Sequence, residues 1–157
     1  MEVKGGDIMP HGKIPFISKK CLNHSNIGNF VHENSKPIVM LGGGHGQDGL
    51  NYLISKKIEH NINLEYNNGV RLGNVPIHQY RSKRRKNGQA WFPKTWTKKD
   101  IYNAGIHVMK LKRNKKRDDN KKYEALYKGV KVGTRTKKGF ITSIFPLYSQ
   151  KCGIKNK

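Results

Sequence analysis

Acidic residues are scarce in this 157-residue chain, which has 10 Asp and Glu against 32 Lys and Arg and a formal net charge of +22. No cluster of carboxylates has the spacing of a metal site, so a nuclease that works through two metal ions is poorly supported. An excess of charge of one sign lowers the stability of the folded protein through self-repulsion. We therefore expect a polyanionic partner, above all RNA, because neutralised phosphates release their condensed counterions.

Cysteines and long apolar runs are also few. Cys21 and Cys152 lie near opposite ends of the chain and are too few for a zinc site, while a disulfide and two free thiols stay equally open. No segment approaches the roughly 18 apolar residues of a membrane span. Residues 1–11 lack the apolar core of a secretory signal peptide. We expect a soluble, monomeric protein without membrane contact.

The order of the predicted elements indicates the α+β class, with an N-terminal helical part followed by antiparallel β-sheet. Residues 1–20 are rich in Gly, Pro and Lys and are interpreted as a flexible lead-in or junction. Residues 21–150 form the predicted single domain. Residues 151–157 form a basic tail, and fraying is expected from Ser149 onward.

Hydrophobic periodicity predicts two helices. The first begins at Asp48, where apolar residues start to recur at helical spacing. In the second, Thr97 is a good N-cap and Asp100 completes a capping box. The apolar run over residues 37–41 indicates a short buried strand or a loop held against the core. Residues 112–122 are almost all charged or polar and predict an exposed loop.

Short apolar runs between turn residues predict strands. The expected strands cover residues 61–66, 69–75, 123–127, 130–134 and 140–145. Asn67-Asn68-Gly69 is typical of a two-residue hairpin turn, because Asn and Gly tolerate positive φ. The last three strands predict an antiparallel meander.

Seven histidines is a high count for this length, and His45 differs from the others in its setting. Three glycines precede it and Gly46 follows it, which predicts an imidazole exposed at a loop tip with the backbone free to approach a ligand. A chance His in a Gly-rich loop and a phosphate-cradling loop are the alternatives. The run matches neither a Walker A nor a dinucleotide-binding pattern.

His78 lies at the exit of a predicted strand, where it opens a strongly basic stretch. The five cations of this stretch are Arg81, Lys83, Arg84, Arg85 and Lys86. A His in this position is well placed to meet a phosphate, and the plain alternative is one more basic loop residue. We interpret the stretch as an RNA-binding segment, with Lys86 also a candidate for catalysis.

RNA cleavage without a metal needs three kinds of group. One takes the proton of the 2′-OH, another protonates the leaving 5′-oxygen, and a cation or hydroxyl stabilises the charge on the phosphoryl oxygens. Imidazoles suit the first two tasks, because their pKa lies near neutrality. The sequence contains all three kinds.

Five further blocks and His78 occur in an order that carries a family resemblance. They are Gly42-Gly43-Gly44-His45, Asn68-Gly69-Val70-Arg71-Leu72-Gly73-Asn74-Val75-Pro76, Gly88-Gln89-Ala90-Trp91-Phe92-Pro93-Lys94-Thr95-Trp96-Thr97, Gly129-Val130-Lys131-Val132-Gly133 and Thr142-Ser143-Ile144-Phe145-Pro146. Over residues 24–148 the chain resembles the bacterial EndoU-type endoribonucleases. The resemblance implies an EndoU-like single domain that cleaves RNA, with tRNA one candidate, to 2′,3′-cyclic phosphate and 5′-OH ends.

The resemblance also implies a biological setting. Members of this family often form the C-terminal toxic module of large toxins used in bacterial competition and contact-dependent inhibition. We therefore expect a module that is secreted or delivered as part of a larger toxin and that acts in the target-cell cytoplasm. An acidic immunity protein is the expected second partner. No cofactor is expected to be required, and stimulation by a divalent metal is left open.

The resemblance matches one family histidine to a single residue of this chain and leaves several candidates for the other. The resemblance implies that His45 is one catalytic histidine. For the other, His24 has the His-x-x-x-Gly setting and is slightly preferred, whereas His32 has the better spacing. His78 is a further alternative, with His45 as its partner.

The remaining family groups fall near the C-terminus and before the Phe-Pro pair. The resemblance implies that Ser143 is the catalytic hydroxyl, with Thr142 adjacent, and that Phe145 stacks on the base where the family often has Tyr. A lysine often precedes the Phe-Pro pair, but Gln89 stands near that place. The candidates for the missing cation are Lys86, Lys83 and Lys94.

Two other functions stay open. A non-catalytic RNA- or DNA-binding module explains the charge equally well, but not the glycine-flanked His or the number of histidines. A basic protein that binds only an acidic protein explains the charge too, and an immunity protein would give the same signal.

Overall fold

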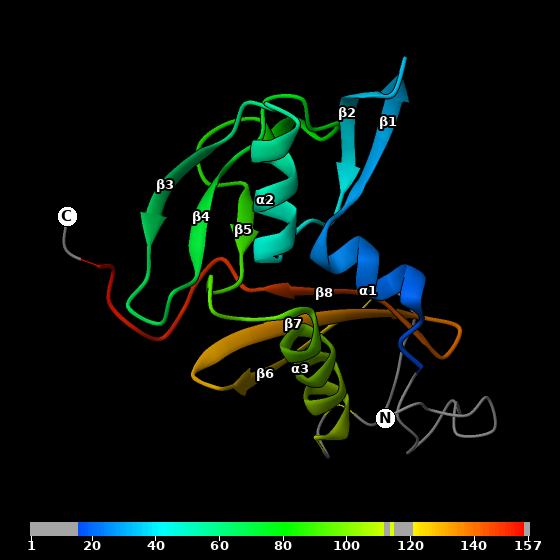
Figure 1. Cartoon of the computed structure of the whole chain (residues 1–157). Helices are drawn as coiled ribbons and strands as arrows, with labels where there is room; N and C mark the ends of the chain where they lie inside the picture. The colour runs from blue at the N-terminus through cyan, green and yellow to red at the C-terminus, as the bar shows by residue number, and fades with distance from the viewer. Residues whose placement is uncertain (1–15, 112–113, 115–120, 156–157) are drawn as a thin grey trace.

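The computed structural model describes residues 16–111, 114 and 121–155, in which helices alternate with three small antiparallel sheets (Figure 1). The helices are α1 (Lys19–Asn26), α2 (Gln47–Ser55), α3 (Lys98–Lys110) and the short 3-10 turn η2 (Arg81–Lys83). The strands are β1 (Asn29–Glu33), β2 (Lys36–Gly42), β3 (Asn61–Glu65), β4 (Arg71–Asn74), β5 (Gln89–Trp91), β6 (Lys122–Tyr127), β7 (Val130–Lys137) and β8 (Phe140–Pro146). The α+β class predicted from the sequence is confirmed.

Each sheet consists of strands that follow one another in the chain. Strands β1 and β2 form a hairpin that projects from the rest of the molecule, while β3-β4-β5 and β6-β7-β8 are three-stranded (Figure 1). Helix α3 packs against β6 and β7, and α1 packs against β8. In the last sheet Arg135 stands opposite Ser143. These contacts bring the N-terminal helix onto the C-terminal strand, although more than a hundred residues separate them.

Most predicted elements are confirmed. The helix expected from Asp48 is α2, and the capping box of Thr97 and Asp100 begins α3. The expected strands correspond to β3, β4, β6, β7 and β8. The prediction of a two-residue turn after β3 is wrong. The N–H of Gly69 donates to the Tyr66 carbonyl at 2.9 Å, and Gly69 has φ +95°, which makes a three-residue loop ending in a left-handed residue.

Helix α1 and the β1–β2 hairpin are not predicted from the sequence. Helix α1 buries Cys21, Ser25 and Asn26, two of which are polar, so no apolar period marks it. Ser18 provides its N-cap by accepting a hydrogen bond from the Cys21 N–H at 3.0 Å. The apolar run over residues 37–41 forms most of β2. Of the two structures expected for this run, a strand or a loop, the structure contains the strand.

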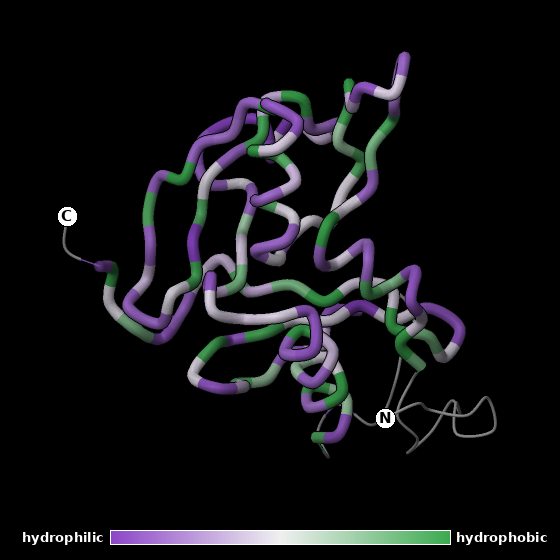
Figure 2. Tube along the Cα trace, viewed as in Figure 1, coloured by the Kyte–Doolittle hydropathy of each residue, from purple (hydrophilic) through white to green (hydrophobic). Residues whose placement is uncertain are grey.

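Two hydrophobic clusters hold the fold together. The larger lies between α3 and the β6-β7-β8 sheet and includes Phe92 stacked on Trp96 at 4.9 Å. The smaller joins α2 to β2 and β5 and contains Met40, Leu50, Leu53, Ile58, Val75 and Trp91. Trp91 and Trp96 are both buried and belong to these clusters. Figure 2 shows that the residues at the tip of the projecting β1–β2 hairpin are hydrophilic.

The C-terminal segment is held against β3. The Lys155 N–H donates to the Glu65 carbonyl at 2.7 Å, and its ammonium pairs with the Glu65 carboxylate at 2.7 Å. The prediction that the chain frays from Ser149 onward is therefore wrong for the described residues up to 155. The loop predicted over residues 112–122 falls mostly outside the described residues. Cys21 and Cys152 are free thiols, and within the described ranges no helix is long and apolar enough to span a membrane.

Candidate active site

A cleft of about 510 Å³ lies where α1, the glycine loop after β2, the segment after His78 and β8 meet. The side chains in its wall that carry chemistry are His24, His45, Tyr80, Lys83, Lys122, Arg135, Ser143, Phe145 and Tyr148. Within the described part of the chain, no carboxylate lines the cleft. The arrangement is suited to an anion with an attached aromatic or apolar group.

Three successive backbone hydrogen bonds fix the glycine loop on α1. The N–H groups of residues 44–46 donate to the carbonyls of residues 24–26 at 2.8, 2.6 and 3.0 Å. The last carbonyls of a helix have no partner inside the helix, so the glycine loop satisfies groups that would otherwise need water. One histidine from each segment is thereby placed at the same cleft.

Glycine is required for this close approach. Gly43 and Gly44 have φ values of +70° and +73°, and a Cβ on Gly43 would lie 1.9 Å from the His24 carbonyl oxygen. A Cβ on Gly44 would lie 2.7 Å from the Met40 methyl group. The prediction of an exposed loop tip is therefore wrong. The glycines let the backbone approach α1 rather than a ligand, and His45 is only 7% exposed.

His45 is held by β5 and the residue that follows it. Its Nδ1–H donates to the Ala90 carbonyl at 2.8 Å, and its own carbonyl accepts from the Phe92 N–H at 2.7 Å. With Nδ1 protonated, Nε2 of the neutral ring carries the lone pair. Burial, followed by the nearby Lys83 ammonium, lowers the pKa of His45 to about 3. The imidazole is therefore a neutral proton acceptor at physiological pH.

His24 occupies the last turn of α1 and is half-buried in the cleft wall. Its Nδ1 is hydrogen-bonded to the Asn29 side-chain oxygen, which fixes the ring orientation. The next residue, Ser25, is fully buried and accepts the Ile144 N–H on Oγ at 2.9 Å, while its carbonyl accepts the His45 N–H. Ser25 therefore ties α1 to β8 and to the glycine loop at once.

The opposite wall carries Lys83. Its ammonium lies 3.1 Å from the Tyr148 hydroxyl and 3.3 Å from the Gly88 carbonyl oxygen. The Tyr148 hydroxyl donates to that same carbonyl at 2.7 Å. Two of the three ammonium protons are thus used to hold Lys83 at the cleft, and the third is left for a bound group.

Side chains hold the segment that presents Tyr80 and Lys83. The Tyr80 N–H donates to Nδ1 of His78 at 3.0 Å, and the Arg84 guanidinium donates to the carbonyls of His78 and Gln79 at 2.7 and 2.9 Å. His78 is 1% exposed. Burial, with the charges of Lys83 and Arg84 as lesser causes, lowers its pKa to about 4. His78 is therefore a neutral structural support behind the cleft wall.

With this geometry established, comparison with known families gives one match. The family model for the bacterial EndoU nuclease covers residues 18–148 of the 157-residue chain. The chain belongs to the bacterial EndoU nuclease family. No curated protein and no solved structure matches it. The protein is accordingly a nuclease, and its family implies an RNA substrate.

The cleft of this EndoU nuclease brings together five of the residues expected from the sequence. They are His24, His45, Lys83, Ser143 and Phe145. The rings of His45 and Phe145 are 6.2 Å apart, which places an aromatic face beside the buried imidazole. Between the two upstream histidines, the geometry favours His24 over His32.

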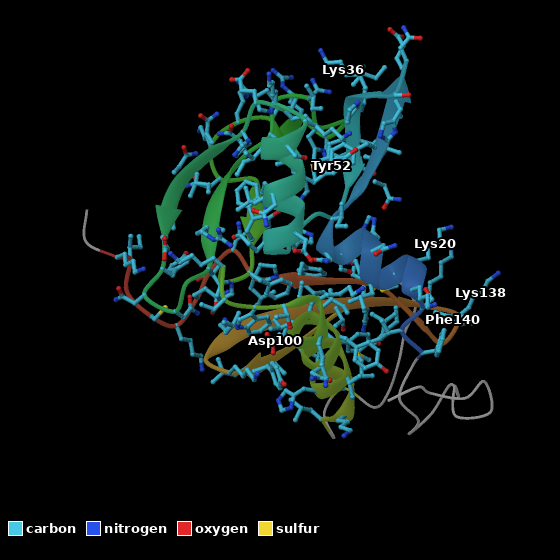
Figure 3. All side chains as sticks on the ribbon, viewed as in Figure 1. Lys20, Lys36, Tyr52, Asp100, Lys138 and Phe140 are labelled. Atoms are coloured by element: carbon cyan, nitrogen blue, oxygen red, sulfur yellow. The ribbon has the colours of Figure 1, made fainter. Side chains whose placement is uncertain are left out.

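His32, Thr142 and Lys86 lie outside the cleft lining. His32 is exposed on β1 and its Nε2 is 3.2 Å from the hydroxyl of Tyr52, which extends from α2 near the hairpin (Figure 3). The exposed Thr142 hydroxyl donates to the Arg135 carbonyl at 3.2 Å. Lys86 lies in a turn with φ +53°, and its backbone carbonyl accepts a hydrogen bond from the Asn74 side-chain amide.

Two lysines, Lys83 and Lys122, line the cleft of this EndoU nuclease, and neither directly precedes the Phe-Pro pair. Gln89, near the usual place of the lysine, is fully buried and donates to the Gly43 carbonyl at 3.0 Å. Lys94 is exposed and does not line the cleft. Of the three candidates, Lys83 alone lines it.

Five residues of the site have no signal in the sequence. The cleft lining includes Tyr80, Lys122, Arg135 and Tyr148, and Ser25 positions both histidines. Single aromatic or hydroxyl residues outside a motif look the same as any surface residue, so only the fold reveals them. Among the described residues, no group of three His, Cys, Asp or Glu side chains could hold a metal ion.

Proposed function

We propose that this EndoU family member is an endoribonuclease that cleaves RNA by acid–base catalysis with two histidines. The observation that carries the proposal is His45, whose Nδ1–H is fixed on the Ala90 carbonyl in a cleft that also holds His24 and Lys83. This arrangement leaves a neutral ring nitrogen available as an acceptor beside a second imidazole and a cation. Transesterification at an RNA phosphate needs this set of groups.

In the proposed reaction His45 is the general base and His24 the general acid. Nε2 of His45 takes the proton of the 2′-OH, and the 2′-oxygen forms a bond to phosphorus. The bond from phosphorus to the 5′-oxygen breaks, and His24 gives its proton to that oxygen. The products are a 2′,3′-cyclic phosphate and a 5′-OH. A bound phosphate anion close to His45 raises its pKa above the value in the free protein, which strengthens the base.

Lys83 and Ser143 are the proposed stabilisers of the transition state. The remaining N–H of the Lys83 ammonium is directed at a phosphoryl oxygen, where charge increases during the reaction. Tyr148 holds the ammonium in place at 3.1 Å and thus restricts it to one position. The Ser143 hydroxyl, on β8 opposite Arg135, supplies a second donor.

Aromatic side chains are the proposed contacts for the base beside the scissile bond. Phe145 is half-buried in the cleft, while Tyr80 and Tyr148 are 57% and 49% exposed at its rim. Stacking of one base on an aromatic ring contributes about 1–3 kcal/mol in single-stranded nucleic-acid complexes. Phe145 keeps this capacity without a hydroxyl.

The proposal extends to the biological setting. We infer that the domain is the toxic module of a larger secreted or delivered toxin, that it acts in the target-cell cytoplasm, and that an acidic immunity protein neutralises it. The net charge of +22 supports an acidic inhibitor as well as RNA. The proposed chemistry requires no metal or other cofactor.

Incubation of the purified protein with total RNA in EDTA tests the proposal. We expect cleavage with cyclic-phosphate ends for the wild type, and loss of this cleavage in His45→Ala. His32→Ala is the matched control, because His32 lies outside the cleft lining and is expected to leave the rate unchanged. Full activity of His45→Ala would exclude the proposed site. Tight, salt-sensitive binding with intact RNA would instead indicate a non-catalytic binding module.

A further inference from the structure

A second cavity lies beside the cleft. It measures about 610 Å³ and is lined by Arg81, Ser82, Arg85, Lys86, Asn87 and Gly88. The two cavities share a wall, because Lys83 of the cleft directly follows the second residue of this lining. The Gly88 carbonyl also accepts the hydrogen bonds from Lys83 and Tyr148 in the cleft.

The backbone around this cavity is fixed by β3 and β4. The Lys86 carbonyl accepts from the side-chain amides of Asn63 and Asn74 at 2.6 and 2.9 Å, and Asn63 also donates to the Asn87 side chain at 3.1 Å. A Cβ on Gly88 would lie 1.8 Å from the Ser82 carbonyl oxygen, so the two sides of the loop are in close contact. The cavity therefore keeps its shape without a ligand.

The cations of the cavity are not used by the fold. Among the described residues, the side chains of Arg81, Arg85 and Lys86 form no ion pair or hydrogen bond, and all three are exposed. Arg84, within the same stretch, differs because its guanidinium is bound to two carbonyls of the loop. Among the described residues, this cavity is lined by three positively charged side chains and by no carboxylate.

Phosphate fits this cavity better than a protein side chain does. The hot spots of protein interfaces are buried aromatic or aliphatic anchors, and no apolar side chain lines the cavity to receive one. A phosphate needs cations and backbone or amide donors, which the cavity supplies. Guanidinium groups also bind phosphate oxygens in a bidentate manner.

We propose that the second cavity is a phosphate-binding subsite that holds the backbone of a single RNA strand beyond the scissile phosphate. The inference rests on the proposed function and adds the substrate class, an extended strand rather than a dinucleotide. Arg81 and Arg85 bind the remote phosphate, and that contact positions the strand in the cleft. Remote contacts of this kind raise kcat/KM for longer substrates.

A kinetic experiment compares a dinucleotide with oligoribonucleotides extended on the 5′ or on the 3′ side. We expect wild-type kcat/KM to rise about tenfold or more on extension in one direction, the scale of one good phosphate contact. The double variant Arg81→Gln/Arg85→Gln should lose that gain, so that its kcat/KM values for the dinucleotide and for the extended substrates become similar. Lys94→Gln/Lys99→Gln removes the same charge from exposed positions outside both cavity linings and should keep the gain. Equal rates for short and long wild-type substrates would overturn the subsite.

A binding experiment with a 2′-deoxy oligonucleotide, which cannot be cleaved through a 2′-OH, keeps the inference separate from the proposed reaction. Each phosphate contact with a single strand changes the slope of log K against log salt by about 0.7, so the Arg81→Gln/Arg85→Gln variant should lower the slope by about 1.4. The Lys94→Gln/Lys99→Gln control should lower the slope of log K against log salt by less than the arginine variant does. Equal slopes for the arginine variant and the wild type would overturn the subsite even if the protein cleaves RNA. A lower slope in a protein that cleaves nothing would support the subsite and refute the proposed function.

Discussion

The two walls of the cleft are built in different ways. The wall formed by α1 and the glycine loop is held by backbone hydrogen bonds between residues 24–26 and 44–46, and it carries both cleft imidazoles. The wall formed by residues 77–88 is joined to β2 by backbone hydrogen bonds between Met40 and both Ile77 and Gln79, and the side chains of His78 and Arg84 hold the segment that presents Lys83. We call them the histidine wall and the basic wall. The imidazoles proposed to exchange protons lie on the histidine wall, and Lys83, which is proposed to contact phosphate, lies on the basic wall.

The difference teaches why each wall depends on its own residue types. The histidine wall needs glycines, because only residues without a Cβ let two backbones approach so closely. The basic wall needs long polar side chains that reach carbonyl groups across a loop. A substitution at a glycine of the histidine wall should therefore disturb folding and catalysis together, whereas a substitution at an exposed cation of the basic wall, such as Arg81, should mainly change charge and substrate binding.

The largest expected effect separates the two upstream histidines. His24→Gln removes the proposed general acid from the histidine wall, and we expect kcat to fall by about 10²–10⁴-fold, the usual contribution of such a group. His32→Gln, on the projecting hairpin, should stay within about twofold of the wild type. The measurement is single-turnover cleavage of an oligoribonucleotide at saturating protein.

The comparison between the walls would fail if the two substitutions had the reverse effects. Loss of activity in His32→Gln with full activity in His24→Gln would move the acid to the hairpin and remove α1 from the mechanism. Circular dichroism of both variants shows whether a loss of rate reflects chemistry or loss of structure.

A smaller effect is expected on stability from the glycines. Gly43→Ala places a Cβ 1.9 Å from the His24 carbonyl oxygen at φ +70°, so the helix and the loop must separate. We expect a loss of about 3 kcal/mol in the free energy of unfolding, combining a steric clash with left-handed strain. Gly129→Ala is the matched control, because it has φ +77° and no atom within 4 Å of the added Cβ. It should cost about 1 kcal/mol through backbone conformation alone.

Urea unfolding curves of both variants measure these differences. Equal losses for Gly43→Ala and Gly129→Ala would show that conformation alone, and not the approach to α1, explains the glycine at position 43. The histidine wall would then be less constrained than its hydrogen bonds indicate.

The sequence predicts the parts of the fold that rest on local patterns. The capping box at Thr97 and the meander of β6, β7 and β8 are marked by periodicity and turn residues, and the structure contains both. Helix α1 is missed because its buried face is largely polar, with Ser25 and Asn26 packed against other backbones. A polar residue that is buried to hydrogen-bond a distant strand has no period along the chain.

The candidate site follows the same division. The motif identifies His45 and Ser143, because the glycine run and the Phe-Pro pair fix them in the chain. It leaves Lys83 as one of three candidate lysines and gives no signal for Tyr148, since the contact between these two joins segments 65 residues apart. The setting of His45 is also misjudged from sequence, because a glycine run favours exposure and close packing equally. Side chains that reach across loops become visible only in three dimensions.

The smallest expected effect tests whether the two walls act on each other. Lys83 on the basic wall is the second cause, after burial, of the lowered pKa of His45, which is about 3. The positive ammonium opposes a positive imidazole, so Lys83→Met should raise this pKa. The value should stay below the ordinary histidine pKa of about 6.5, because burial remains. The exposed Lys94→Met variant, which removes a charge outside the cleft lining, should leave it unchanged.

NMR titration of the His45 ring measures the pKa directly, and the acid limb of kcat/KM provides a second readout. A base with a higher pKa is protonated at higher pH, so the acid limb of Lys83→Met should move upward even though its plateau is lower. The plateau reports the lost phosphate contact, while the position of the limb reports the charge between the walls. An unchanged His45 pKa in Lys83→Met would mean that burial alone controls the base and that the basic wall serves binding only.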